Sequence, residues 1–133
     1  MPELPEVETI VRELRETLPG RRIHRVRVFR GDALGGVPEA RFVRALRGRT
    51  VAAVERRGKY LLFPLAPKDW LVAHLRMTGK FVLCDAPPQV HPHHRVWFEL
   101  DDGAVLVFQD LRCLGTLEVV AAPEVTVSSF CTS

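Results

Sequence analysis

Residues 95–108, RVWFELDDGAVLVF, decide most about the fold. Two apolar runs flank the turn Asp101-Asp102-Gly103, which is a strong signal for a β-hairpin. Apolar runs of similar length recur along the chain between turn residues. We expect strands over residues 23–30, 50–56, 60–65, 71–75, 81–84, 95–100, 104–108 and 116–120.

Two helices are expected beside these strands. One apolar stripe at helical spacing ends before Pro19-Gly20 and consists of Val7, Val11, Leu14 and Leu18. A short helix is expected over residues 38–46, with three side chains inward: Phe42, Val43 and Leu46. The glycine-rich residues 31–38 should form a loop. The pattern predicts an α+β, mainly β fold, a two-layer β-sandwich with flanking helices.

Length and composition indicate a single globular domain. The chain has 133 residues, of which 47% are hydrophobic and 26% charged. Cys84, Cys113 and Cys131 form no CxxC pair and no zinc-ligand pattern, which favours a reduced protein without disulfides. No apolar run has the length of a membrane span, and the acidic N-terminus does not resemble a signal peptide. We therefore expect a cytoplasmic protein without a membrane partner.

The positive charge is unevenly distributed along the chain. The net charge is only +3, yet residues 21–59 contain eleven Arg and one Lys against Asp32, Glu39 and Glu55. Arginine suits bidentate contacts to phosphates. A charged run is more often a solvated face, so this segment alone leaves both a solvated face and a nucleic-acid surface open.

The N-terminus, MPELPEVE, carries the clearest chemistry. Methionine before a small residue such as Pro2 is normally removed, which would leave a free amine beside Glu3. An α-amine titrates near pKa ~7.7–8.0, against ~10.4 for lysine, so far more of it is unprotonated at neutral pH. Such an amine can attack an electrophilic carbon to form an iminium intermediate. Pro5, Glu6 and Glu8 also suit an ordinary helix start, but that alternative does not account for Pro2-Glu3.

Residues 2–9, PELPEVET, resemble the signature of the formamidopyrimidine-DNA glycosylase and endonuclease VIII family of base-excision repair enzymes. The resemblance implies that Pro2 attacks C1′ of a damaged nucleotide, that Glu3 acts as general acid and base, and that Glu6 supports it. It covers residues 1–120 and implies the family's N-terminal catalytic domain. The implied activity is excision of oxidised purines (8-oxoguanine and formamidopyrimidine) with cleavage at the abasic site. The implied partner is double-stranded damaged DNA, bound by a usually monomeric protein at the nucleoid.

Two further motifs resemble loops of the same family. Residues 56–61, RRGKYL, match its RRGK loop, which implies that Lys59 contacts DNA near the lesion, as part of the catalytic group with Pro2 and the two glutamates. Residues 74–79, HLRMTG, match its HLxMTG segment, which implies that His74 and Arg76 touch the DNA backbone and that Met77 fills the gap left by a flipped nucleotide. A basic turn and a core methionine remain the alternatives.

A third motif departs from the family. Residues 109–115, QDLRCLG, resemble D-x-R-R-F-G, in which Arg112 would contact the cytosine opposite the lesion. Cys113 replaces the second arginine, and Leu114 replaces the aromatic wedge. Leucine lacks aromatic stacking, worth about 1–3 kcal/mol per base in single-strand systems, so we expect weaker DNA distortion. Met77 and Arg112 favour the purine-lesion branch of the family.

Residues 121–133 are expected to form an atypical tail. Full-length relatives continue through a helix–two-turn–helix module and usually a finger that holds one structural zinc, so no cofactor is expected here. DNA held from one side should bind weakly and with strong salt dependence. Two alternatives stay open: a catalytically impaired DNA-binding module, and a tautomerase-like enzyme in which Pro2 acts as general base.

Overall fold

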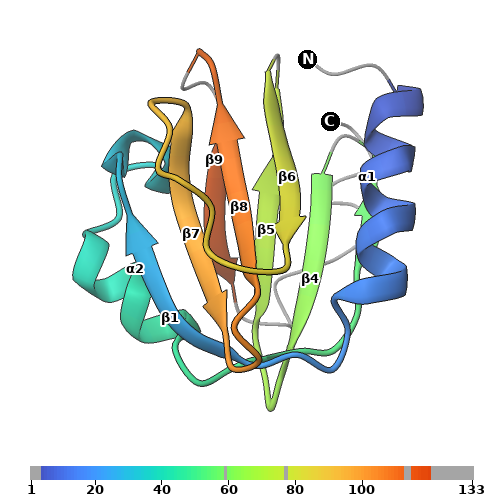
Figure 1. Ribbon diagram of the computed structural model, residues 1–133, viewed down its shortest axis with the longest axis horizontal. Coiled ribbons are helices and arrows are strands. Elements are labelled where there is room, and N and C mark those ends of the chain that lie inside the picture. Colours follow the sequence, from blue (N-terminus) through green and yellow to red (C-terminus); the bar gives the residue numbers. More distant parts are fainter. Residues whose placement is uncertain (1–3, 59, 77, 113–114, 121–133) are drawn as a thin grey trace.

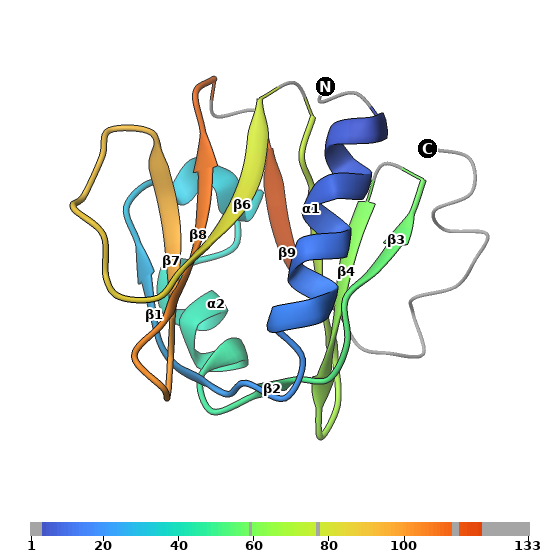
Figure 2. The ribbon, with the colours of Figure 1, turned by 45° about the vertical axis from the view of Figure 1, so that its right-hand side comes forward.

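The computed structural model describes residues 4–58, 60–76, 78–112 and 115–120, with side chains from Val7 onward. They form two facing β-sheets, and the two sheets are flanked by helices α1 (Leu4–Thr17) and α2 (Glu39–Leu46) (Figure 1). Each helix contacts one edge strand of each sheet, so each covers one open side of the sandwich (Figure 2). The predicted two-layer β-sandwich with flanking helices is confirmed.

The first sheet contains four antiparallel strands in the order β1-β7-β8-β6. Their bounds are β1 (Ile23–Val28), β6 (Gly79–Cys84), β7 (His94–Leu100) and β8 (Val105–Asp110). The hairpin expected at residues 101–103 is present: Leu100 N donates to Ala104 O at 2.9 Å, and Gly103 has a φ of 91°. Strand β1 ends two residues earlier than expected, because Phe29 N and Arg30 N both donate to Arg95 O and end the regular ladder.

The second sheet contains β2 (Thr50–Val51), β3 (Glu55–Arg57), β4 (Tyr60–Ala66), β5 (Trp70–His74) and β9 (Thr116–Val120). The single strand expected over residues 50–56 is wrong, because β2 and β3 pair separately with the two ends of β4. In the segment between β2 and β3, Ala52 N donates to Pro64 O at 2.8 Å, so the backbone of Pro64 faces this segment. Because proline has no N–H to donate back, the hydrogen-bond ladder along this edge of β4 is interrupted at Pro64.

One further expectation needs correction in the glycine-rich segment. Residues 31–38 are not wholly a loop, because they begin with a 3₁₀ helix, η1 (Gly31–Leu34). Ala33 and Leu34 of this helix are buried in the main core. Their burial supplies a tertiary contact that the loop composition does not reveal.

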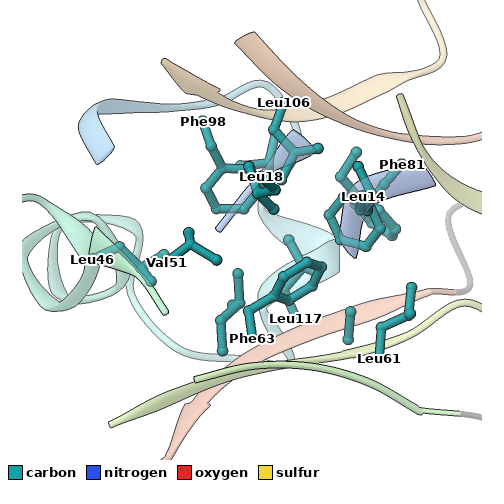
Figure 3. Close-up of a cluster of buried hydrophobic side chains, with 14 of the residues drawn as sticks. Leu14, Leu18, Leu46, Val51, Leu61, Phe63, Phe81, Phe98, Leu106 and Leu117 are labelled. Atoms are coloured by element: carbon teal, nitrogen blue, oxygen red, sulfur yellow. The ribbon is translucent and has the colours of Figure 1, made fainter. Parts of the chain in front are cut away.

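The core lies between the two sheets and under both helices (Figure 3). The predicted stripe of α1 is buried at all four positions, with no side chain more than 3% exposed. Phe63 of β4 meets Phe81 of β6 edge to face, with ring centroids 5.2 Å apart. From α2, Phe42 and Leu46 are buried as predicted, and Val43 is half-buried. Apolar burial between the layers is therefore what holds the two sheets together.

A second, smaller apolar cluster lies on the outer face of the first sheet, where the segment before β7 crosses β7 and β8 (Figure 1). Trp97 is its centre, and Trp97 Nε1 donates to His94 Nδ1 at 3.0 Å. His91 N donates to the same nitrogen at 3.4 Å. Burial lowers the pKa of His94 below its ordinary value, and the nearby His91 and His93 lower it further. The neutral imidazole is the form that accepts both hydrogen bonds.

This arrangement predicts that stability falls in mild acid. Because the folded-state pKa of His94 lies below its unfolded value of 6.5, the unfolded chain binds the proton more readily. The contribution of His94 to the free energy of unfolding is full above pH 6.5 and is lost as the pH falls below it. Urea unfolding, followed by tryptophan fluorescence at pH 7.5 and 5.5, measures this loss. His94→Gln should reduce it. An unchanged pH dependence in His94→Gln would contradict the assignment.

None of the helices in the described part of the chain has the length and apolar character needed to cross a bilayer.

Candidate functional site

Several chain segments that carry the sequence motifs meet at one end of the sandwich. Register places Tyr60, His74 and Thr116 side by side in the second sheet, with Arg57 opposite Tyr60. In the first sheet, Gly79 pairs with Asp110 at the same end. Figure 1 and Figure 2 show the start of α1 at this end too. We call the connection through residues 75–78 the β5–β6 loop, and the connection through residues 111–115 the β8–β9 loop.

Asp110, at the end of β8, joins these two loops. Its side chain is 1% exposed. Oδ1 accepts a hydrogen bond from Thr78 Oγ1 and another from Arg112 N at 3.1 Å. Oδ2 accepts a hydrogen bond from Gly115 N at 2.6 Å. One buried carboxylate therefore holds one residue of the β5–β6 loop and two residues of the β8–β9 loop.

Glycine is required where these loops approach the sheets. A Cβ on Gly115 would lie 2.8 Å from Phe108 Cζ and 3.1 Å from His74 O. A Cβ on Gly79 would lie 2.6 Å from Leu75 O, the atom to which Gly79 N donates at 2.9 Å. The contacts of 2.8 and 2.6 Å are shorter than a Cβ tolerates without a shift of its neighbours, so the loops fit the sandwich closely.

The start of α1 is held by a separate interaction. Arg56 Nε of β3 lies 2.5 Å from Glu8 Oε1, in the second turn of the helix. Arg56 also donates through Nη1 to Gly58 O at 3.1 Å. This pair links the beginning of α1 to the turn between β3 and β4, and it does not involve Asp110.

The arginine-rich segment does not form one uniformly basic surface. At the end of the sandwich opposite the two loops, three of its arginines pair with aspartates. These aspartates lie in the turn before β8 and in the turn before β5. The pairs are Arg21–Asp102 at 3.2 Å, Arg22–Asp101 at 3.8 Å and Arg49–Asp69 at 3.3 Å. Arg56 and Arg57 of this segment lie at the end that carries the loops. The arginines of residues 21–59 are therefore not gathered at the end that carries the loops.

The comparison with protein families decides the assignment. Residues 1–117 match the model of the formamidopyrimidine-DNA glycosylase N-terminal domain. The chain belongs to this family.

Full-length relatives extend well beyond the matched part. The chain is 43% identical over 125 residues to the formamidopyrimidine-DNA glycosylase of Moorella thermoacetica, covering 94% of this chain and 46% of that protein. It is 43% identical over 126 residues to the enzyme of Geobacillus kaustophilus, covering 93% of this chain and 45% of the relative. The chain thus spans about half the length of the curated relatives it matches.

Solved structures of this family have the same fold. The Lactococcus lactis enzyme in complex with DNA that contains FAPY-dG superposes with a TM-score of 0.85 and 30% identity. That match covers 92% of this chain and 45% of the other. The complex of the same enzyme with DNA that contains an abasic site gives a TM-score of 0.86 at 30% identity. The two structural neighbours are therefore glycosylases of this family bound to damaged DNA.

The formamidopyrimidine-DNA glycosylase domain brings three of the predicted site residues to one end. His74 is half-buried at the end of β5, with its ring 4.7 Å from that of Tyr60. Arg76 and Arg112 are exposed on the two loops, and Arg76 has a φ of 54°, in the left-handed region. Glu6 lies in the first turn of α1, with only its backbone described.

The remaining predicted site residues lie outside the described residues: Pro2, Glu3, Lys59, Met77 and Leu114. Their roles stay predictions. The expected tail over residues 121–133 also lies outside. Within the part of the chain that is described, no three His, Cys, Asp or Glu side chains are grouped to hold a metal ion.

The motifs did not single out Asp110, although they contain it. The available signal is its place two residues after the apolar run of β8, where a charged side chain at a strand end faces either solvent or a loop. Its burial and its partner Thr78, 32 residues away, appear only in the folded chain.

Proposed function

We propose that this chain removes oxidised purines from double-stranded DNA through Pro2 and then cuts the strand at the abasic site. The observation that carries the proposal is spatial. Exposed Arg76 and Arg112, together with His74, lie at the end of the sandwich where α1 begins. Cationic side chains at this end would attract the phosphates of a DNA substrate.

The proposed chemistry proceeds in two stages. The Pro2 nitrogen uses its lone pair to form a bond to C1′ while the bond from C1′ to the base breaks. The base keeps the electron pair of the broken bond and takes up a proton supplied by Glu3. The Pro2 nitrogen then loses its proton, the C1′–O4′ bond breaks, and O4′ takes that electron pair and a proton, which leaves an iminium between Pro2 and C1′. Loss of a C2′ proton then expels the 3′ phosphate by β-elimination, and δ-elimination releases the 5′ phosphate. Water finally hydrolyses the iminium and regenerates the amine.

The other site residues would prepare the DNA for this reaction. Met77 and Leu114 would occupy the space left when the damaged nucleotide leaves the helix, because apolar side chains can replace part of the lost stacking. Lys59, His74 and Arg76 would bind phosphates, and Arg112 would contact the base opposite the lesion. Glu6 would support proton transfer beside Glu3.

Borohydride trapping tests the proposal. Chain verified by intact mass to begin at Pro2 is mixed with duplex DNA containing an abasic site, and sodium borohydride reduces any iminium to a stable bond. We expect an adduct with the combined mass of protein and DNA, and none with the same duplex without the abasic site. Absence of the adduct would overturn the proposal.

Glu3→Gln separates base removal from attack on the sugar. An amide cannot deliver the proton, so excision from 8-oxoguanine duplex should fall by about 10²–10⁴-fold, the range typical of general acid–base catalysis. Trapping on a preformed abasic site should fall less, because no base has to leave. Single-turnover excision assays and trapping on matched duplexes give the comparison. Equal losses in both assays would contradict this role for Glu3.

A second candidate function is that of a damaged-DNA-binding domain with impaired catalysis. It is favoured by one observation, that the structural neighbours are complexes with damaged DNA. Binding to lesion-containing duplex without any adduct would support it. The tautomerase-like alternative has no further support, because the chain belongs to a DNA glycosylase family.

A further inference from the structure

We propose that Asp110 is a positioning residue that makes the β5–β6 loop and the β8–β9 loop act as one unit on duplex DNA. The inference rests on the proposed function, because it concerns how the exposed Arg76 and Arg112 are held for DNA. Asp110 itself is buried, so its proposed role is to hold the loops and not to contact the DNA.

The hydrogen bonds make the coupling mutual. Thr78 Oγ1 donates to Asp110 Oδ1 and also accepts from Arg112 N at 3.1 Å. Arg112 N therefore shares its hydrogen between two acceptors, Thr78 Oγ1 of the β5–β6 loop and Asp110 Oδ1 at the end of β8. Gly115 N, on the far side of the same loop, donates to the other carboxylate oxygen. Movement of either loop breaks a bond made by the other.

Both carboxylate oxygens are needed for this arrangement. A carboxylate presents only acceptors, and three donors converge on Asp110. An asparagine of the same shape has one acceptor oxygen and one NH₂ group, so a donor would face Gly115 N or the pair of Thr78 and Arg112. A buried N–H left without its partner is strongly unfavourable.

The surroundings leave no easy compensation. Asp110 is 1% exposed and its bond from Gly115 N is buried, so bulk water cannot take the place of that acceptor. Gly115 already lies against Phe108 and His74, and Gly79 lies against Leu75, so neither loop can move closer to the sheet. Loss of the carboxylate should therefore let the loops move away from the sheets.

The effect should depend on the DNA substrate. The start of α1 is held by the Arg56–Glu8 pair, which is independent of Asp110, so the amine of Pro2 should keep its reactivity. In duplex DNA the target nucleotide must leave the stack, and the two loops would stabilise the gap. In single-stranded DNA no such gap has to be made. Loss of the coupling should therefore impair duplex substrates selectively.

Asp110→Asn tests the inference by trapping on the same abasic oligonucleotide, single-stranded and in duplex. We expect the ratio of duplex to single-strand trapping rates to fall about tenfold, the factor that corresponds to one buried hydrogen-bond partner lost. Single-strand trapping should stay within about twofold of the parent. As a spectroscopic readout, 2-aminopurine beside the abasic site should brighten less with Asp110→Asn, because its fluorescence reports unstacking.

Asp102→Asn is the matched control. Asp102 Oδ1 also accepts a backbone hydrogen bond, from Ala104 N at 3.0 Å, but at the opposite end of the sandwich. Its duplex to single-strand ratio should equal that of the parent. Thr78→Val removes both hydrogen bonds of Thr78 Oγ1, to Asp110 and from Arg112 N, without placing an unpaired amide beside Gly115, and should lower the ratio in the same direction. It keeps the test decisive if Asp110→Asn fails to fold.

The outcomes are separable. A parent chain that forms no adduct on either substrate overturns the proposed function and, with it, this inference. If the parent forms adducts but Asp110→Asn and Thr78→Val keep its ratio of duplex to single-strand trapping rates, the inference is overturned and the proposed function stays intact. Equal losses on both substrates would also overturn it, because they would indicate a structural role alone.

Discussion

The chain that retains Met1 is expected to form no borohydride-trapped adduct with abasic DNA, whereas the same chain without Met1 forms one. With Met1 in place, the nitrogen of Pro2 belongs to a peptide bond, and resonance withdraws its lone pair. The amine of Met1 is displaced by one residue, about 3.8 Å along the chain, from where the reaction needs it. Nucleophilic attack on C1′ should therefore be lost, and trapping should fall to the level seen without protein.

The two forms can be compared on one preparation. Protein is divided, and one half is treated with a methionine aminopeptidase until intact mass shows complete loss of Met1. Lys68→Arg, at an exposed lysine between β4 and β5, should trap like the parent and excludes this lysine amine as the source of the adduct. Equal trapping by the forms with and without Met1 would remove Pro2 from the mechanism.

Phe63→Ala should lower the free energy of unfolding by about 3–5 kcal/mol. Phe63 is fully buried on β4 and packs edge to face on Phe81 of the opposite sheet (Figure 3). Truncation removes its apolar contacts and leaves a cavity between two sheets that the helices hold from both sides. Native proteins have about 5–15 kcal/mol in total, so this one change removes a large share of it.

Urea unfolding monitored by circular dichroism measures the difference between variant and parent. Val90→Ala is the matched control, because Val90 is 52% exposed and its truncation should shift stability by less than about 0.5 kcal/mol. A value for Phe63→Ala within about 1 kcal/mol of the parent would mean that the two layers are not held together through this contact.

The local elements were largely predictable, and the errors have identifiable causes. The stripe of α1 and the hairpin around Gly103 follow from periodicity and turn chemistry within single segments. The division of residues 50–57 into β2 and β3 depends on Pro64 of another strand, so no pattern within the segment could reveal it. The 3₁₀ helix η1 similarly depends on the burial of Ala33 and Leu34 against distant parts of the chain.

The candidate site was predictable to a different extent. The motifs named His74, Arg76 and Arg112, and the fold brings these three to one end of the sandwich. The motifs did not indicate the role of Asp110, because its donors come from Thr78, Arg112 and Gly115 on two separate loops. They also could not show that Arg21, Arg22 and Arg49 pair with aspartates at the opposite end.

The sequence by itself determined most of the elements, the buried faces of both α-helices and the family, because periodicity, turn residues and contiguous motifs are properties of neighbouring residues. Only the tertiary structure decided which strands pair, which arginines are paired with acids and which carboxylate links the two loops. Those outcomes depend on contacts between residues far apart in the chain, such as Thr78 with Asp110 and Arg56 with Glu8. Such contacts follow from packing the two sheets around one apolar core, which no single segment specifies.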